Sequence, residues 1–357
     1  MLKPEQLFRA EIRDLSAYHV QDAADYIKLD AMENPYTWDD EQKQLWLETL
    51  AEVSVNRYPD PGAEQLKAEL RRTMQVPDNS AIILGNGSDE LIQMLALAIA
   101  GAGHKLLTPE PGFVMYRLLA QIAGMEYVSL PLQNSNFDLD KAAMLAAIKK
   151  HQPALVFLAY PNNPTGNLFE RSTVEAIIQA TPGLVVVDEA YCAFAQDSFM
   201  ADLEKYPNLL VMRTVSKIGL AGLRVGMLAG DTQWLNELEK VRLPYNLNVL
   251  SQASAIFALQ HYERLTEQTQ KICKDREALF QALKAMPPVQ VWPSQANFIL
   301  FRVPDAPALF ASLKQQGILI KNLHGSHSLL ENCLRVTVGK PDENRLFLDA
   351  LRKGLGI

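Results

Sequence analysis

One stretch of the sequence combines an amine nucleophile with groups that can hold an anion. Residues 213–226 read RTVSKIGLAGLRVG, so Lys217 lies beside the hydroxyls of Thr214 and Ser216 and precedes three glycines and Arg224. Lysine is the side chain that forms an exchangeable imine with an aldehyde. A lone lysine at this place would more often be a solvated surface charge. A catalytic role for Lys217 is therefore inferred only together with the other stretches described below.

A second stretch places an acid directly after an apolar run. Residues 184–191 read LVVVDEAY, so we expect Asp188 at the mouth of a sheet and partly buried. A buried carboxylate needs a cation or a hydrogen-bond donor as its partner. A protonated pyridine nitrogen would serve as that cation, and the structural alternative is a cap on a following helix.

Two loops complete the set. LGNGSDE, residues 84–90, leaves an expected strand and enters a helix, whose free N–H groups can bind an anion. Interpreted as a dinucleotide fingerprint with Glu110 as the ribose-binding acid, it lacks the third glycine, and a plain turn is a further alternative. AYPNNPTG, residues 159–166, holds two asparagine amides in a stiff loop at a strand end, where ligands bind in open α/β sheets.

Together the four stretches predict one site for pyridoxal 5'-phosphate, because each supplies a group that this cofactor requires. The phosphate is expected at the helix start after Gly87. Lys217 is expected to bind the aldehyde and Asp188 the pyridine nitrogen. The remaining predicted contacts are Thr214, Ser216 and Arg224 to the phosphate, and Asn163 and Tyr191 to the ring oxygen.

The elements around these stretches alternate. Between about residues 64 and 230, helical segments separate short apolar strands at 81–84, 105–108, 127–130, 155–159, 184–187, 209–213 and 225–229. Strands that are apolar on both sides indicate a largely parallel sheet covered on both faces. The sequence therefore predicts a doubly wound α/β domain.

After residue 230 the pattern changes. A helix near 234–241 and one long helical stretch from about 249 to 286 lead to a smaller α+β pattern that ends the chain. The first 40 or so residues contain no strand and helix unit of their own and should dock on other parts. We expect an N-terminal arm that is part of the small domain over 1–44, a large cofactor-binding domain over 45–245 and a C-terminal small domain over 246–357.

Composition excludes several classes of protein. The 357 residues are 48% hydrophobic and 21% charged, which is ordinary for a globular protein, and the formal net charge is −7. Because no Lys/Arg-rich tract is present, we expect neither a nucleic-acid nor a membrane partner. Three scattered cysteines predict no disulfide framework and no metal site, and the charged N-terminus lacks a signal peptide, so we expect a cytoplasmic protein.

The chain resembles the fold type I aminotransferases, which depend on pyridoxal phosphate, in PNNPTG, VVDEAY and SKIGLAGLRVG. With LDAMENPY, NRYPDP, LGNGSDELI, SQANFILFR and LRVTVG it is similar to the histidinol-phosphate aminotransferase family from near Ile27 to near Gly339. The resemblance implies a homodimer with active sites at the subunit interface. It also implies a large domain that holds the cofactor and a small domain that closes over the substrate.

The resemblance also implies roles for single residues. Lys217 would form the imine and move the proton, Asp188 would keep the pyridine nitrogen protonated, and Phe113 would stack on the ring. Tyr58 would reach the cofactor phosphate of the neighbouring subunit. Asn163 and Tyr191 would bond the ring oxygen. The implied contacts near the phosphate are Gly87, Ser88, Asp89, Thr214, Ser216 and Arg224.

For the substrate, the resemblance implies that Arg335 binds the acid group and that Tyr18 lies near its phosphate. Three departures from the family pattern stand out. Lys321 occupies the place of a second phosphate-binding arginine, so it supplies charge without a planar fork. Met32 replaces a frequent asparagine, and the interval from Lys217 to Arg224 is one residue shorter than in many relatives.

The expected reaction is transamination in histidine biosynthesis. It converts L-histidinol phosphate and 2-oxoglutarate to 3-(imidazol-4-yl)-2-oxopropyl phosphate and L-glutamate. Two alternatives share most of the motifs: an aromatic or broad-specificity amino-acid aminotransferase, and a threonine-phosphate decarboxylase. An idle ligand-binding domain of this fold is disfavoured because Lys217 is present.

Overall fold

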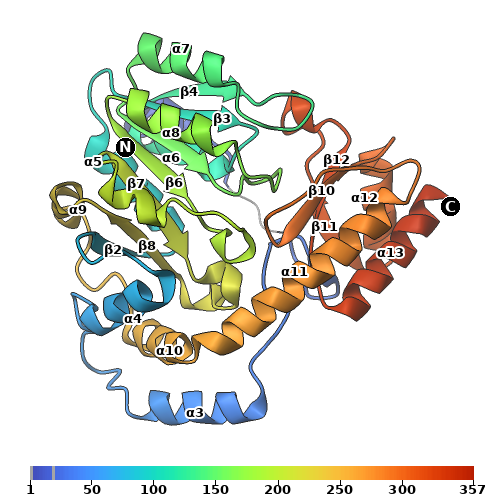
Figure 1. Cartoon of the computed structure of the whole chain (residues 1–357), viewed down its shortest axis with the longest axis horizontal. Helices are drawn as coiled ribbons and strands as arrows, with labels where there is room; N and C mark the ends of the chain where they lie inside the picture. Colours follow the sequence, from blue (N-terminus) through green and yellow to red (C-terminus); the bar gives the residue numbers. More distant parts are fainter. Residues whose placement is uncertain (1–2, 18–20) are drawn as a thin grey trace.

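Two β-sheets organise the molecule, as Figure 1 shows. The computed structural model describes residues 3–17 and 21–357. The large sheet has seven strands in the order β2-β8-β7-β6-β5-β3-β4. Its strands are β2 (Ala81–Asn86), β3 (Lys105–Glu110), β4 (Glu126–Pro131), β5 (Leu155–Ala159), β6 (Leu184–Asp188), β7 (Leu209–Thr214) and β8 (Val225–Gly230).

The middle of the large sheet is parallel, as the sequence predicts. Strands β5, β6 and β7 are buried along their whole length, because their Val and Leu side chains face packed helices on both sides. Strand β8 departs from the pattern and runs antiparallel to both β7 and β2. The carboxyl ends of β5, β6 and β7 therefore share one edge of the sheet.

Helices cover both faces of this sheet. One face carries α5 (Ser88–Ile99), α6 (Val114–Ala123) and α9 (Thr232–Glu239), whose apolar side chains form one core cluster with the strands. The other face carries α4 (Glu64–Met74), α7 (Lys141–His151) and α8 (Arg171–Ala180). The predicted doubly wound domain is therefore present.

The small sheet joins residues from both ends of the chain. Its order is β1-β11-β12-β10-β9, with β1 (Ile27–Leu29), β9 (Gln290–Val291), β10 (Phe298–Arg302), β11 (Ile318–Asn322) and β12 (Cys333–Thr337). Helices α12 (Ala306–Gln315) and α13 (Pro341–Leu355) pack beside it (Figure 1). Strand β1 lies parallel to β11, which places the segment after residue 29 beside the large sheet's carboxyl edge.

The long helical stretch expected over 249–286 is two helices, which corrects the sequence-based prediction. Helix α10 (Val249–Gln260) ends at His261, whose backbone is not helical, and α11 (Tyr262–Lys284) follows. The two helices have different partners: α10 packs against α4 and α3 (Asp40–Ala51), whereas α11 packs against the small sheet's strands and α13. The chain changes direction where the packing partner changes.

Short helices complete the chain. Near the N-terminus are α1 (Pro4–Leu7) and α2 (Ala10–Arg13), and α2 contacts α6. The 3-10 helices are η1 (Cys192–Phe194), η2 (Met200–Glu204), η3 (Ser216–Ile218), η4 (Ala221–Leu223) and η5 (Ser328–Leu330). Three of them, η1, η3 and η4, follow or connect the strands whose ends carry the predicted site.

Candidate active site

A cavity of about 360 Å³ opens at the carboxyl ends of β5 and β6 and at the end of β7. This is the edge at which open α/β sheets bind their ligands. The loop after β1, with residues 31–33, contributes to its wall from the small-sheet side. The lining residues are Ala31, Met32, Glu33, Ser88, Asp89, Phe113, Ala159, Pro161, Asn163, Asp188, Ala190, Tyr191, Thr214, Ser216, Lys217, Ala221, Gly222 and Arg224.

Lys217 enters the cavity from η3, directly after β7. Its Nζ lies 3.4 Å from the carbonyl oxygen of Ala31 and 5.8 Å from the centre of the Tyr191 ring. Burial, followed by the nearby guanidinium of Arg335, lowers the pKa of Lys217 from its ordinary value to about 8. A larger fraction of this amine is therefore uncharged near neutral pH than at an ordinary lysine pKa, and the uncharged form is the one that acts as a nucleophile or base.

Asp188 ends β6 and faces the same cavity. Burial raises the pKa of Asp188 from its ordinary value to about 6, and hydrogen bonds from Tyr116 and from the backbone N–H of Ala190 oppose that rise. The Tyr116 hydroxyl donates to Oδ2 at 2.6 Å, and the Ala190 N–H donates to Oδ1 at 3.1 Å. Both of these partners are neutral, so the carboxylate is suited to receive a cationic ligand group.

An anion cradle lies at the start of α5. Gly87, with φ of +81°, is the N-cap of the helix, and the first two helical residues, Ser88 and Asp89, line the cavity. A Cβ on Gly226 would lie 2.6 Å from the carbonyl carbon of Gly87 and 2.6 Å from the amide nitrogen of Ser88, so the strand β8 approaches this turn closely. The guanidinium of Arg224 lies 3.4 Å from Asp89 at the same place.

Two hydroxyls extend the cradle. Thr214 and Ser216 are both buried, with their oxygens 2.9 Å apart, and the backbone N–H of Ser216 donates to the Thr214 hydroxyl at 3.1 Å. Together with the start of α5 and Arg224 they form a polar pocket of donors and one cation. Such a set suits a phosphate group.

Asn163, Tyr191 and Arg335 form a hydrogen-bonded chain along the wall. The Asn163 amide donates to the Tyr191 hydroxyl at 3.2 Å, and Nη1 of Arg335 donates to the amide oxygen of Asn163. Nη2 of Arg335 donates to the carbonyl oxygen of Asp30 at 3.1 Å. This buried arginine is thereby fixed between the two sheets.

A second cavity of about 440 Å³ adjoins the first, and both are lined by Met32, Phe113 and Asn163. Arg335 and Lys321 line this second cavity. They are directly opposite each other on the antiparallel strands β12 and β11, so their side chains leave the same face of the small sheet. Two like charges placed opposite each other repel, and an anion between them would remove that repulsion.

The structure brings together most of the residues predicted from the sequence. Two lie elsewhere. Tyr58 is 80% exposed, stacks on Tyr245 with ring centres 4.5 Å apart, and is not among the described residues that line either cavity. Tyr18 lies outside the described residues. Glu110, weighed as a ribose-binding acid, instead accepts hydrogen bonds from Tyr127 and Arg117 at the wall of the second cavity.

Sequence reasoning missed the support behind Asp188. Tyr116 lies 72 positions away in the chain, and only its place in the first turn of the helix that Phe113 precedes could have indicated its contact with the site. Glu189, next to Asp188, was also missed as a structural anchor. It is fully buried and accepts two hydrogen bonds from Arg213 at 2.9 and 2.7 Å.

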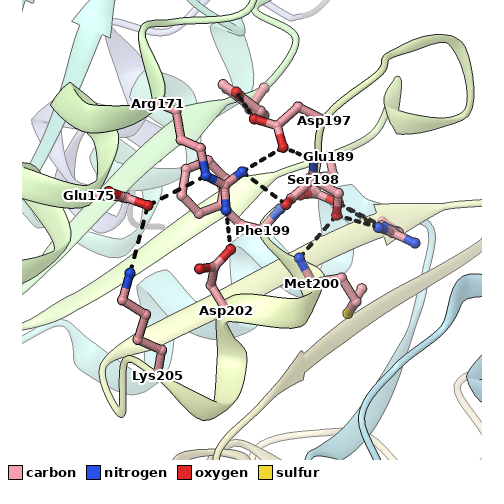
Figure 2. A network of polar contacts seen from close by, with 11 residues as sticks. Arg171, Glu175, Glu189, Asp197, Ser198, Phe199, Met200, Asp202 and Lys205 are labelled. Carbon is pink, nitrogen blue, oxygen red and sulfur yellow. Dashed lines mark hydrogen bonds and ion pairs between the residues drawn. The ribbon is translucent and has the colours of Figure 1, made fainter.

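The anchor belongs to a wider network, shown in Figure 2. Ser198 donates to Glu189 at 2.9 Å, and Arg171 pairs with Asp197, Asp202 and Glu175. The network fixes the segment between β6 and β7 beneath the strand ends.

Comparisons with known proteins agree with this geometry. The model of the family "Aminotransferase class I and II" matches residues 24–351. The histidinol-phosphate aminotransferase 2 of Nitrosococcus oceani is 58% identical over 98% of this chain and 97% of that protein. The histidinol-phosphate aminotransferase of Chromobacterium violaceum is 53% identical over 99% of each.

Solved structures show the same fold. The histidinol-phosphate aminotransferase of Sinorhizobium meliloti, in complex with pyridoxal-5'-phosphate, has a TM-score of 0.85 at 26% identity, over 98% of both chains. The L-threonine-O-3-phosphate decarboxylase of Porphyromonas gingivalis has a TM-score of 0.75 at 25% identity, over 93% of this chain and all of that one. By the extent of the family match and the identity to its relatives, the chain belongs to the class I and II aminotransferases and, within them, to the histidinol-phosphate aminotransferase family.

Proposed function

We propose that this protein is a pyridoxal phosphate-dependent aminotransferase that moves the amino group between L-histidinol phosphate and 2-oxoglutarate. The observation that carries the proposal is the convergence of Lys217, Asp188 and the phosphate cradle on one cavity. The identity of 58% to a histidinol-phosphate aminotransferase supports the choice of substrate.

The donor set fits this cofactor. The cradle at Gly87, Thr214, Ser216 and Arg224 would hold its phosphate, since a side chain at Gly226 would displace the turn that forms it. The Asp188 carboxylate, with neutral partners only, would pair with the protonated pyridine nitrogen. Phe113 would stack on the ring, and Asn163 and Tyr191 would bond its oxygen. Ser88 and Asp89 would lie at the phosphate.

The bound cofactor supplies an aldehyde that accepts amino groups and a ring that withdraws electrons from the substrate. Lys217 would hold the aldehyde through Nζ. Released by the substrate's amine, the same Nζ would be placed to accept the proton from the carbon that bears the amino group, and its lowered pKa near 8 suits a base. Asp188 holds a proton on the ring nitrogen, so that the ring continues to withdraw charge.

The substrate's acid group is assigned to Arg335 and Lys321 and, by the family resemblance alone, to Tyr18, which lies outside the described residues. Arg335 presents a planar fork that suits both a carboxylate and a phosphate. The facing pair of cations in the second cavity supports this assignment. One site can therefore accept glutamate and a phosphate ester in turn.

The active assembly is proposed to be a homodimer. Tyr58 is highly exposed and stacks on Tyr245, which is also exposed. An exposed apolar surface of this kind is typical of a protein interface. Across such an interface Tyr58 would contact the cofactor phosphate of the partner subunit. Among the described residues no helix is long and apolar enough to span a membrane, and the cytoplasmic location stays a prediction.

Spectroscopic titration separates the candidate substrates. The absorbance of the purified protein with pyridoxal phosphate is followed while L-histidinol phosphate or L-phenylalanine is added. Response to histidinol phosphate at a far lower concentration supports the proposal. An equal response to both indicates a broad aminotransferase, and carbon dioxide release from O-phosphothreonine indicates the decarboxylase.

A further inference from the structure

Tyr116 contacts Asp188 without lining the cavity itself. It lies in the first turn of α6, three residues after Phe113, and only 1% of its side chain is exposed. Its ring stacks on Phe157 with centres 4.6 Å apart and meets the edge of Phe113 at 5.5 Å. The phenol is therefore held from two sides, with its hydroxyl fixed on the carboxylate.

The charges around Asp188 make this hydrogen bond consequential. Asp89, from the start of α5, and Glu189, the next residue of the chain, both disfavour a further negative charge at Asp188. Tyr191 and Tyr116 are the phenols beside it, and Lys217 and Arg224 are the cations that line the same cavity. Within this group the Tyr116 hydroxyl is the side chain that donates to the Asp188 carboxylate.

We propose that Tyr116 is a positioning residue that keeps Asp188 ionised and directed at the pyridine nitrogen of the cofactor. The inference deepens the proposed function, since it rests on Asp188 as the partner of that nitrogen. Tyr116 does not touch the reacting atoms. It acts through the hydrogen bond to Oδ2 and through the fixed orientation of the carboxylate.

The position of the shared proton, on Tyr116 rather than on Asp188, supports this role. Burial, followed by the neighbouring Asp188, raises the pKa of Tyr116 well above its ordinary value, so the proton stays on the phenol. The bond thus stabilises the carboxylate and lowers the pKa of Asp188, against the burial that raises it to about 6. Without the hydroxyl, the Asp188 pKa would rise further, and a larger fraction of the acid would be neutral at neutral pH.

The test compares two probes on the cofactor-free protein. One is pyridoxal phosphate, and the other is its 1-deaza analogue, in which a C–H replaces the ring nitrogen. Dissociation constants are measured from about pH 5 to about pH 9, a range that includes the raised pKa of a buried carboxyl. Tyr116→Phe removes one oxygen and leaves the stacked ring, so it isolates the hydrogen bond.

We expect Tyr116→Phe to weaken pyridoxal phosphate binding by about tenfold at neutral pH, as the loss of a hydrogen bond to a charged group does. Binding of the deaza analogue should change little, because that ring cannot pair with Asp188. The pH below which pyridoxal phosphate affinity falls should move upward. Tyr116→3-fluorotyrosine, a stronger donor of nearly the same size, should move it downward and provides a second variant if the first does not fold.

Tyr160→Phe is the matched control. Its hydroxyl also donates to an acid, Asp197, at 2.8 Å from a buried ring, and its side chain lines neither cavity. It should leave both affinities and the pH midpoint unchanged. Equal weakening of both probes by Tyr116→Phe, or no weakening of either, would overturn the role of Tyr116. If the unmutated protein bound neither probe, the proposed function would fail as well.

Discussion

At the scale of single residues, burial shifts two groups in opposite directions. It lowers the pKa of Lys217 to about 8 and raises the pKa of Asp188 to about 6. Between these values a growing fraction of the lysine is a free amine while most of the acid is charged. Both states favour capture of an aldehyde cofactor with a basic ring nitrogen.

This ordering predicts the pH dependence of cofactor capture. The uncharged fraction of a lysine rises with pH, is one half at the pKa and levels off about one to two pH units above it. The rate at which cofactor-free protein takes up pyridoxal phosphate should therefore rise with a midpoint near pH 8 and approach a plateau above about pH 9. Stopped-flow absorbance measures this rate. A midpoint at the ordinary lysine value, about 10.4, would contradict the lowered pKa.

Lys217→Ala should reduce turnover by about 10²-fold or more, because both the attachment point and the base are lost. Pyridoxal phosphate should still bind through the cradle and Asp188, but borohydride should no longer fix it to the chain. Activity assays and peptide mass spectrometry read the two effects. Lys205→Ala, at an exposed lysine that pairs with Glu175, is the control and should keep both properties. Full activity in Lys217→Ala would refute its assignment.

At the scale of elements, the close approach of β8 to the start of α5 shapes the proposed phosphate cradle. Gly226 permits that approach, because a Cβ there would lie within 2.6 Å of two backbone atoms of the turn. Backbone atoms cannot move aside as a flexible side chain can. The cradle therefore depends on the absence of a side chain at this position.

Gly226→Ala should consequently weaken pyridoxal phosphate binding by about tenfold or more, through displacement of the N–H groups at the helix start. Equilibrium titration of the cofactor-free protein measures the change. Gly101→Ala, just beyond the opposite end of α5, is a suitable control, since its added methyl meets only the His104 ring at 3.4 Å. Unchanged affinity in Gly226→Ala would show that the turn does not hold the phosphate.

The sequence predicted the buried strands well, but it did not predict the break between two helices or the short strand β1. Strands β5, β6 and β7 were predicted nearly residue for residue, since long apolar runs have no other place than a covered sheet. The break at His261 was missed because both flanking helices have helical composition, and only their different partners separate them. Strand β1 was missed because three residues carry no periodic signal.

The same limit applies to the site. Residues inside motifs, such as Lys217 and Asp188, were predicted because a strand end in an α/β sheet places them at one edge. The contacts of Tyr116 with Asp188 and of Arg213 with Glu189 join residues 72 and 24 positions apart. No local pattern encodes such pairs, since they exist only once the sheet has formed.

At the scale of the whole molecule, Tyr58 lies on the surface, away from the residues that line its own chain's cavity. If it completes the site of a partner subunit, each active site combines Lys217 from one chain with Tyr58 from the other. Inactive chains with different lesions can then complement each other.

We predict that Lys217→Ala and Tyr58→Ala proteins, each of low activity, regain activity when dissociated and reassembled together. Random pairing leaves one intact site in half of the dimers, so about a quarter of all sites should be active. The readout is turnover per subunit after mixing, with each variant reassembled alone as the control. No gain above the separate variants would show that each site is built from one chain.

The central claim is tested most directly by following one nitrogen atom. L-Histidinol phosphate labelled with ¹⁵N in its amino group is incubated with the protein, pyridoxal phosphate and 2-oxoglutarate, and the products are analysed by mass spectrometry. The account predicts labelled glutamate and the oxo phosphate ester in equal amounts, and almost none with Lys217→Ala. Absence of labelled glutamate from the unmutated, cofactor-loaded protein would contradict the claim.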